Sequence, residues 1–290
     1  MAPSASELVA TVRSWAECIN EKRWDELPKY MHYPYNQNGK EYTTESFTAH
    51  VRDDVAPILG GDIRIHEDSL LVDERTHRVA HTLWLKFKSE VPFLGYPPTG
   101  RDVYLIEHGF MWFTDGKLSK RLFLINSEDI REQLANPDAE YKPSLMSEYP
   151  VPKSEIALSR QQLEEVLINY VNMFNARKLT EKGKYVHEPE TLLNNNELAC
   201  KIMGDTLAAI PDVQVKIETI VADEESQRVA VLLKFSGTPI KEYDGLVANG
   251  RPVLYTEHAT YQFLDGKIQR IWGARDLNEA KRQQQESPVA

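Results

Sequence analysis

Two glutamate–histidine pairs stand in the middle of predicted strands, and both residue types can move protons during catalysis. Glu107 and His108 occur in "TGRDVYLIEHGFMWFTDGKL", and Glu257 and His258 occur in "NGRPVLYTEHATYQFLDGKI". Side chains alternate between the two faces of a strand, so only one residue of each pair can enter a given pocket. The sequence leaves open which one does. A glutamate that only pairs with a nearby arginine is the alternative to a chemical role.

A second candidate for proton transfer is Asp276, at the end of the last predicted strand. Period-two alternation places it on one face with Arg270, Trp272 and Ala274. A partly desolvated carboxylate there would have a raised pKa, in the range useful for moving a proton next to a carbonyl group. The alternative is that Asp276 caps a helix beginning in "LNEAKRQQ".

The corresponding position of the first half is Asn126, whose amide can hold a carbonyl group but cannot take its proton. We therefore expect an asymmetric pair, in which the second half is chemically competent and the first is structural or differently specialised.

His32 and His187 also recur, each followed two residues later by a proline. They are candidates for lining a pocket, although a histidine that satisfies a local carbonyl group would recur as well. His81 has no histidine counterpart, since Val231 stands in its place, and no credible metal site is expected.

Aromatic residues crowd the predicted strands, and most of them should be core. A minority that lines an apolar pocket would suit a polycyclic or terpenoid molecule. No phosphate loop and no Ser or Cys nucleophile motif is recognisable. The residues predicted to bind substrate are Tyr170, Tyr255, Trp272, His32, His108, Asn126 and Trp84.

These residues are carried by a duplicated unit. Asp115 and Asp265, like the two histidines above, lie 150 positions apart, and the offset becomes 155 nearer the start, where "YMHYP" matches "YVHEP". A long period that occurs only twice indicates a domain duplication. The first copy is expected at 1–134, a proline-rich linker at 135–158, the second copy at 159–284 and a tail at 285–290.

Each copy is predicted to contain three helices followed by alternating strands. The first helices begin near Ser6 and at Ser159, where Gln162 completes a possible capping box. A short second helix should end at His32 or His187, before the proline, and a third helix should follow. In the first copy, strands are expected at 62–72, 78–88, 101–113 and 117–126, with Asp-Gly hairpin turns between the last two in each copy.

Composition restricts the possible partners. The formal net charge of -10 argues against a nucleic-acid binder, which needs a basic face. The two cysteines, one per half, do not suggest a disulfide framework, and an intracellular, cytoplasmic setting is expected. No signal peptide is recognisable, and no apolar stretch approaches the roughly 20 residues that a membrane helix needs.

The closing segments "GRDVYLIEHGFMWFTDGKLSKRLFLIN" and "GRPVLYTEHATYQFLDGKIQRIWGARD" resemble the last strands of SnoaL-like domains of the NTF2-like superfamily. The resemblance implies an α+β fold in which helices pack on a curved, mostly antiparallel sheet to form a cone-shaped barrel. It also implies pairing of the two copies as an intramolecular pseudo-dimer, with further homodimer formation possible. The family typically uses no metal or organic cofactor, and in similar members the terminal aspartate, here Asp276, acts as general acid or base.

The resemblance favours an enzyme over a passive binding protein. We expect a cofactor-independent cyclase, isomerase or dehydratase that acts on a hydrophobic polyketide- or terpenoid-derived molecule in secondary metabolism. Asp276 would move the proton, and His258 or His187 would polarise or protonate an oxygen. The alternative is a noncatalytic small-molecule binding or protein-interaction module of the same superfamily.

Overall fold

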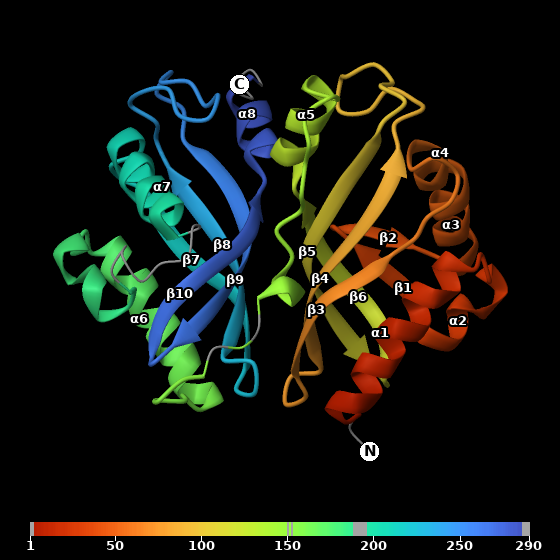
Figure 1. Cartoon of the computed structure of the whole chain (residues 1–290), viewed down its shortest axis with the longest axis horizontal. Helices are drawn as coiled ribbons and strands as arrows, with labels where there is room; N and C mark the ends of the chain where they lie inside the picture. The colour runs from red at the N-terminus through yellow and green to blue at the C-terminus, as the bar shows by residue number, and fades with distance from the viewer. Residues whose placement is uncertain (1–2, 150, 152, 188–195, 286–290) are drawn as a thin grey trace. The chain divides into compact units, whose positions relative to one another are not determined.

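The computed structural model describes residues 3–149, 151, 153–187 and 196–285, and the chain divides into two compact units, Met1–Pro150 and Val151–Ala290 (Figure 1). Each unit has its own sheet, its own helices and its own hydrophobic core. Both units are α+β, as predicted. The tail beyond residue 285 lies outside the described residues.

The first unit contains a six-stranded sheet in the order β2-β1-β6-β5-β4-β3, antiparallel except for the parallel pair β1 and β6. Its elements are α1 (Ala5–Asn20), η1 (Trp24–Glu26), α2 (Leu27–Tyr30), β1 (Met31–Gln37), β2 (Lys40–Tyr42), α3 (Thr44–Ala49), η2 (His50–Val55), α4 (Ala56–Ile58), β3 (His66–Asp73), β4 (Arg78–Lys88), β5 (Asp102–Thr114), β6 (Lys117–Ile125), α5 (Ser127–Ala135) and η3 (Met146–Glu148).

The second unit contains an antiparallel four-stranded sheet in the order β10-β9-β8-β7. Its elements are α6 (Arg160–Asn175), η4 (Leu179–Lys184), α7 (Asn196–Ala209), β7 (Gln214–Asp223), β8 (Arg228–Gly237), β9 (Val253–Leu264), β10 (Lys267–Arg275) and α8 (Leu277–Gln285).

Side-chain caps decide where the first helix of each unit begins. The predicted capping box of Ser159 and Gln162 is present at the start of α6. In α1 the cap is Ser4 rather than Ser6, because Ser4 and Glu7 close a capping box around the first turn. The helix therefore starts at Ala5, and Ser6 lies within its first turn.

The predicted second helix of the first unit is shorter than expected, because α2 ends at Tyr30 and His32 belongs to strand β1. The segment that follows α2 forms a hairpin of β1 and β2 instead of continuing the helix. Asn38 and Gly39 both adopt positive φ, at 48° and 84°, which is the geometry of a tight hairpin. This Asn-Gly pair was the local signal for a hairpin that the sequence prediction missed.

The four predicted strands of the first unit correspond to β3, β4, β5 and β6. The Asp115-Gly116 and Asp265-Gly266 turns join the last two strands of each unit, as predicted, with all four residues at positive φ. Long strands joined by tight turns hold their neighbours in a defined register. That register decides which side chains meet in the site.

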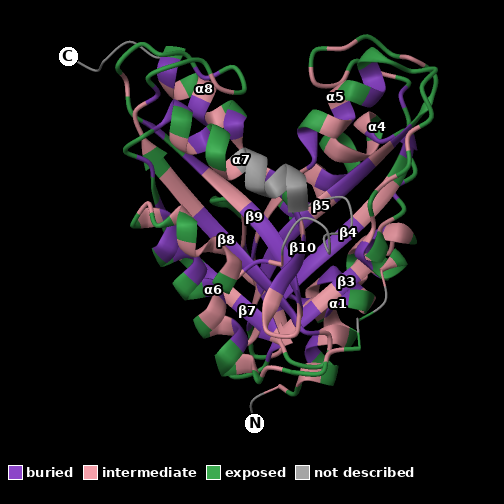
Figure 2. Cartoon of the chain, turned by 60° about the vertical axis from the view of Figure 1, so that its left-hand side comes forward, coloured by how far each residue is buried: buried purple, intermediate pink, exposed green. Residues whose placement is uncertain are grey.

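The first helix of each unit packs on one face of its sheet, which we call the interior face; the opposite face is the outer face (Figure 1). α1 contributes Leu8, Val12 and Trp15 to the first core, and α6 contributes Leu163 and Leu167 to the second. Figure 2 shows that burial concentrates in the strands, whereas the helices carry both buried and exposed residues. Such two-sided helices are typical of an α+β layer architecture.

The predicted linker at 135–158 contains the division between the two units. Part of it is tied to the first unit, since the Asp68 carboxylate accepts backbone N–H groups of Met146 and Ser147 at 2.9 Å each. Another part is tied to the second unit, where Ser154 Oγ donates to Asp265 Oδ1 at 2.9 Å. The segment is thus anchored at both ends.

Candidate functional site

The strand register answers which residue of each glutamate–histidine pair faces inward. In β5, Leu105 and Met111 belong to the core under α1, so Glu107 shares their interior face. In β9, Tyr255 and Ala259 belong to the core under α6, so Glu257 likewise faces inward. Each copy therefore presents one carboxyl group at the same place on its interior face.

The two histidines lie on the outer faces. His108 is buried there, with Nδ1 at 3.2 Å from Thr82 Oγ1. His258 is also buried and stands opposite Ala274 in the β9–β10 pair. The sequence left open which residue of each pair faces a pocket, and strand alternation places both histidine side chains away from the interior. The catalytic role of His258 and the substrate-binding role of His108 stay predictions.

In the first copy, Glu107 is the centre of a polar cluster that sequence reasoning did not assemble. His81 Nε2 lies 2.8 Å from Glu107 Oε1, and Nη2 of Arg121 donates to the same oxygen. His81 faces inward because it pairs with Gly109 across β4 and β5. A Cβ atom at Gly109 would lie 2.5 Å from the His81 ring, so glycine is what allows the imidazole to lie there.

Arg121 is held between aromatic rings. Its guanidinium carbon lies 4.8 Å from the Trp15 ring centroid and 4.5 Å from that of Phe123, within the range of cation–π contacts. Burial lowers the pKa of Arg121 to about 10, while Tyr35 acts in the opposite direction. The guanidinium remains charged at neutral pH, and it holds Glu107 in a closed ion pair.

In the second copy, Glu257 lacks these partners. Val231 stands where the first copy has His81, and Ile271 stands where it has Arg121. The Glu257 side chain forms no hydrogen bond or ion pair with another of the described residues. Burial raises the pKa of Glu257, and Arg275 opposes the shift. The residue nevertheless keeps some accessible surface.

The cation nearest to Glu257 in the sheet is Arg275, directly opposite it in the β9–β10 pair. Arg275 is engaged elsewhere: Nη1 donates to the Tyr243 hydroxyl at 2.9 Å, and Nη2 lies 3.1 Å from Asp244 Oδ2. The Tyr243 hydroxyl also lies 2.9 Å from Thr206 Oγ1 on α7. These contacts fix Arg275 close enough to influence Glu257 without closing an ion pair.

Asp276 and Asn126 both stand immediately before a helix, but only the Asp276 side chain caps it. Asp276 stands immediately before α8, and its Oδ1 accepts the Glu279 N–H at 3.2 Å, as in the capping alternative. Asn126 Oδ1 accepts the Ile106 N–H at 2.7 Å, and its amide nitrogen donates to Asp129 at 3.2 Å. The catalytic role of Asp276 and the substrate-binding role of Asn126 stay predictions.

The recurring histidines behave differently from each other. His187 Nε2 lies 2.7 Å from the Leu264 carbonyl oxygen, and its backbone N–H donates to Ile268 at 3.0 Å, which matches the local-carbonyl alternative. His32 is partly buried in β1, and no hydrogen bond joins its imidazole to another described residue. Their roles in a pocket stay predictions, and Pro189 lies outside the described residues.

The predicted aromatic lining is divided between the two faces. Tyr255 and Tyr170 face inward: Tyr255 stacks on Phe235 with centroids 4.8 Å apart, and Tyr170 packs against Tyr261. Trp272 and Trp84 lie on the outer faces, opposite Thr260 and Ile106 respectively. Only the first two are placed to contact a ligand inside the second copy.

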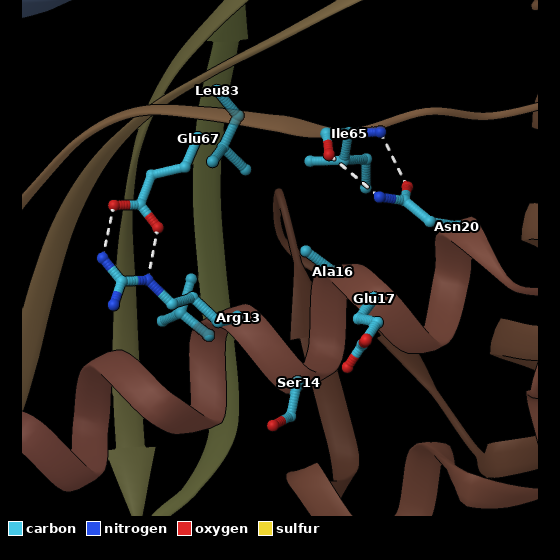
Figure 3. Close-up of a pocket in the computed structure, with 9 residues that line it drawn as sticks. Arg13, Ser14, Ala16, Glu17, Asn20, Ile65, Glu67 and Leu83 are labelled. Carbon is cyan, nitrogen blue, oxygen red and sulfur yellow. Dashed lines mark hydrogen bonds and ion pairs between the residues drawn. The ribbon is translucent and has the colours of Figure 1, made fainter. Parts of the chain in front are cut away.

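A surface hollow of about 360 Å³ opens between α1 and β3 of the first unit (Figure 3). Its rim carries Arg13 and Glu67, which form two hydrogen bonds at 2.7 and 2.8 Å. Asn20 binds both the N–H and the carbonyl group of Ile65, at 2.7 and 2.9 Å. Leu83 lies at its inner wall, directly opposite Glu107 in the β4–β5 pair.

Sequence reasoning missed His81, Arg121 and Arg275. In the other copy an apolar residue stands at each of these positions: Val231 for His81, Ile271 for Arg121 and Ile125 for Arg275. This difference between the copies was the signal that the sequence offered. Within the described ranges, no three His, Cys, Asp or Glu side chains come together in a way that could hold a metal ion. Among the described helices, none combines the length and apolar composition of a membrane-spanning segment.

Comparison with solved structures finds chains that each match less than half of this chain. A SnoaL-like polyketide cyclase from Agrobacterium tumefaciens is 28% identical, with 42% of this chain and 97% of that chain covered at a TM-score of 0.38. TsrD from Streptomyces laurentii is 17% identical, with 46% of this chain and 97% of that chain covered at a TM-score of 0.40. IdmH from Streptomyces antibioticus is 22% identical, with 42% of this chain and 98% of that chain covered at a TM-score of 0.36.

A search of curated proteins found no match. The family model described as SnoaL-like polyketide cyclase matches residues 9–134 and again residues 164–284, which together make up most of the chain. The two matches fall on the two units and confirm the duplication. The chain therefore belongs to the SnoaL-like polyketide cyclase family, with two tandem copies of the domain.

Proposed function

We propose that the second copy is a cofactor-independent acid–base catalyst that cyclises, isomerises or dehydrates a small hydrophobic carbonyl compound. The observation that carries the proposal is Glu257, an interior carboxyl group with no ion pair among the described residues. Its burial raises its pKa, which brings the group closer to the range in which it can both give and take a proton at neutral pH.

The chemistry needs only one proton carrier and one nearby positive charge. In its acid form Glu257 donates a proton to a substrate carbonyl oxygen or to a departing hydroxyl group. The resulting carboxylate is stabilised by Arg275, which stands opposite it on β10. It then accepts a proton from a substrate carbon, which restores the acid and leaves an isomerised, cyclised or dehydrated product.

The surroundings of Glu257 favour a flat, apolar substrate. Leu233 pairs with Glu257 across β8 and β9, and Tyr255 and Phe235 stack beside it. Tyr261 lies farther along the same interior face. An apolar cavity with few polar groups binds mainly by shape and burial, with the carboxyl group fixing orientation. A polyketide-derived ring or chain has this character, in keeping with the family to which the chain belongs.

A noncatalytic binding protein is the second candidate, and one observation favours it. Asp276, the carboxylate expected to move the proton, caps α8 through the Glu279 N–H. The interior Glu107 of the first copy is likewise held by His81 and Arg121. Under this reading Glu257 would only orient a ligand.

The test compares turnover by three variants of the full chain. Wild type is incubated in deuterated buffer with a panel of hydroxylated polyketide-type ketones, and isomerised, cyclised, dehydrated or deuterated products are followed by mass spectrometry. We expect Glu257→Gln to reduce the rate roughly 10²- to 10⁴-fold, the usual contribution of a general acid or base. The exposed Glu225→Gln of the same unit is the matched control and should keep full activity.

Asp276→Asn separates the two possible proton carriers. If Asp276→Asn abolishes turnover while Glu257→Gln does not, the assignment of Glu257 is wrong and Asp276 is the acid–base group. If wild type binds the compounds but forms no product from any of them, the binding protein is the better description.

A further inference from the structure

A tight turn between β8 and β9 lies next to the cation that stands closest to Glu257 in the sheet. Tyr243 N–H donates to the Leu246 carbonyl oxygen at 3.1 Å, and Leu246 N–H donates back at 2.8 Å. Asp244 and Gly245 between them both adopt positive φ, at 49° and 80°, which is the geometry of a two-residue hairpin turn. Because Leu246 is fully buried in the core of the second unit, the turn is anchored there.

The turn presents two polar side chains to Arg275. Nη1 of Arg275 donates to the Tyr243 hydroxyl at 2.9 Å, and Nη2 lies 3.1 Å from Asp244 Oδ2. The Tyr243 hydroxyl also lies 2.9 Å from Thr206 Oγ1, so α7 takes part in the same network. Two nitrogens of the guanidinium are therefore engaged by the loop.

Arg275 would be within reach of Glu257 without these contacts. The two residues stand directly opposite each other in the β9–β10 pair. Side chains at such positions start from Cβ atoms about 4.5–5.5 Å apart, a distance that an arginine can bridge to a carboxylate. The first copy shows a closed pair of this kind, because Arg121 donates to Glu107.

The first copy keeps the turn but lacks its polar side chains. Residues 93–96 form the same pair of backbone hydrogen bonds, at 3.1 and 2.9 Å. The residues of the first copy that correspond to Tyr243, Asp244 and Arg275 are Phe93, Leu94 and Ile125. The three polar residues thus occur together in the copy whose interior glutamate has no ion pair among the described residues.

Few charged or titratable groups surround Glu257. Leu233 stands opposite it on β8. The groups that interact with Glu257 or with its two tyrosine neighbours on β9 are Arg275, Tyr243, Asp244, Tyr255, Tyr261 and Tyr170. Arg275 is the cation of this set, so its position decides whether Glu257 acquires a charged partner.

The helices near this sheet carry other charged groups, which are exposed or engaged elsewhere. Asp205 on α7 is exposed. On α8, Glu279 pairs with Arg282 at 2.7 Å. Lys281 of the same helix lies over the turn, where a Cβ atom at Gly245 would be 2.9 Å from its Cε atom.

We propose that Tyr243 and Asp244 are positioning residues that hold the Arg275 guanidinium at the β8–β9 loop. They keep it from closing an ion pair with Glu257, and Thr206 fixes the Tyr243 hydroxyl. The proposal rests on the proposed function, because an acid–base group must be able to give and take its proton. A released Arg275 would turn Glu257 into a fixed carboxylate, as Glu107 is in the first copy.

The test measures how tightly Glu257 holds its proton and needs no substrate. The full chain with carbon-13-labelled glutamate carboxyl groups is titrated by NMR, and the Glu257 signal is identified by its absence from Glu257→Gln. The test variant is Tyr243→Phe/Asp244→Asn, since phenylalanine occupies the first position in the other copy and asparagine tolerates positive φ. We expect the proton affinity of Glu257 to fall roughly tenfold or more, as for a carboxyl group that gains an arginine partner.

Arg275→Gln is the matched background, because it separates movement of the guanidinium from the direct effect of losing the Asp244 charge. In that background the same two substitutions should leave the proton affinity of Glu257 nearly unchanged. Circular dichroism checks that each variant is folded. Asp244→Asn alone changes a side chain that is 44% exposed, and it should give a smaller decrease if the double variant does not fold.

An unchanged or higher proton affinity of Glu257 after release of the turn contacts would overturn the proposal. An equal decrease in the Arg275→Gln background would also overturn it, because the effect would then not pass through the guanidinium. Turnover is scored separately. If the titration behaves as expected but wild type converts no compound, the positioning stands and the proposed function fails; if Glu257→Gln loses turnover but the titration does not move, the reverse holds.

Discussion

At the scale of single residues, the two copies keep the same interior glutamate and surround it differently. Glu107 is neutralised by His81 and Arg121, whereas Glu257 has an apolar environment and a neighbouring cation, Arg275, that is engaged by other partners. A paired carboxylate is a fixed charge, but an unpaired buried carboxyl group changes its protonation easily. The two glutamates thus differ in their surroundings; that the second copy alone is chemically competent stays a prediction.

The raised pKa of Glu257 predicts a dependence of stability on pH. Because the folded state holds this proton more tightly than the unfolded state, the stabilisation is complete below the ordinary glutamate value of 4.5. It is lost as the pH rises through the raised pKa. Relative to Glu257→Gln, wild type should therefore lose unfolding free energy as the pH rises from 4.5 through the raised pKa of Glu257.

Urea unfolding of both proteins at several pH values measures this difference. The exposed Glu225→Gln serves as the control and should follow the wild-type curve. If the unfolding free energies of wild type and Glu257→Gln changed with pH in parallel, the raised pKa of Glu257 would be contradicted.

At the scale of elements, the repeated caps and clamps explain why both copies fold alike. Asn20 at the end of α1 binds the backbone of Ile65 in both directions, and Asn175 at the end of α6 binds Val215 in the same way, at 2.8 Å for each contact. Each clamp ties the first helix to the start of one strand of its sheet, β3 in the first unit and β7 in the second. The helix is thereby held over the interior face that carries the glutamate.

Asp276 gives the prediction that belongs to this scale. Because its carboxylate caps α8, Asp276→Ala should lower the free energy of unfolding by about 1 kcal/mol, whereas Asp276→Asn should cost only a few tenths, since asparagine caps equally well. Chemical denaturation checks both values. An equal loss for both variants would show that the carboxylate does more than cap the helix.

At the scale of the whole molecule, the chain consists of two units with separate cores. Among the residues that the structure describes, none is shared between the core that includes Trp15 and the core that includes Tyr170. Units of this size bury enough apolar surface to fold alone. Pairing of the copies as a pseudo-dimer, and any further homodimer, stay predictions.

The separation of the cores predicts that each unit is stable when produced separately. Chains of 1–150 and 151–290 should each show a cooperative thermal transition by circular dichroism. A broad, non-cooperative melt of either piece would mean that its core needs the other unit.

Part of the site was predictable from local patterns. Alternation required that glutamate and histidine face opposite sides, and the repeat required the same solution in both copies. The Asp-Gly pairs predicted the hairpins that align β5 with β6 and β9 with β10. The Asn38-Gly39 turn carried an equally strong signal, yet the proline that follows His32 suggested the end of a helix instead.

The sequence by itself determined the duplication, the α+β order of elements and the place of a carboxyl group in the middle of a strand. It did not determine which face of the sheet each of these side chains occupies. Alternating side chains can be assigned to the two faces in either of two ways until a helix covers one face. Packing of α1 and α6 made that choice and turned Glu107 and Glu257 inward. The partners also depended on tertiary structure: His81 is 26 residues from Glu107 and meets it only through the β4–β5 register.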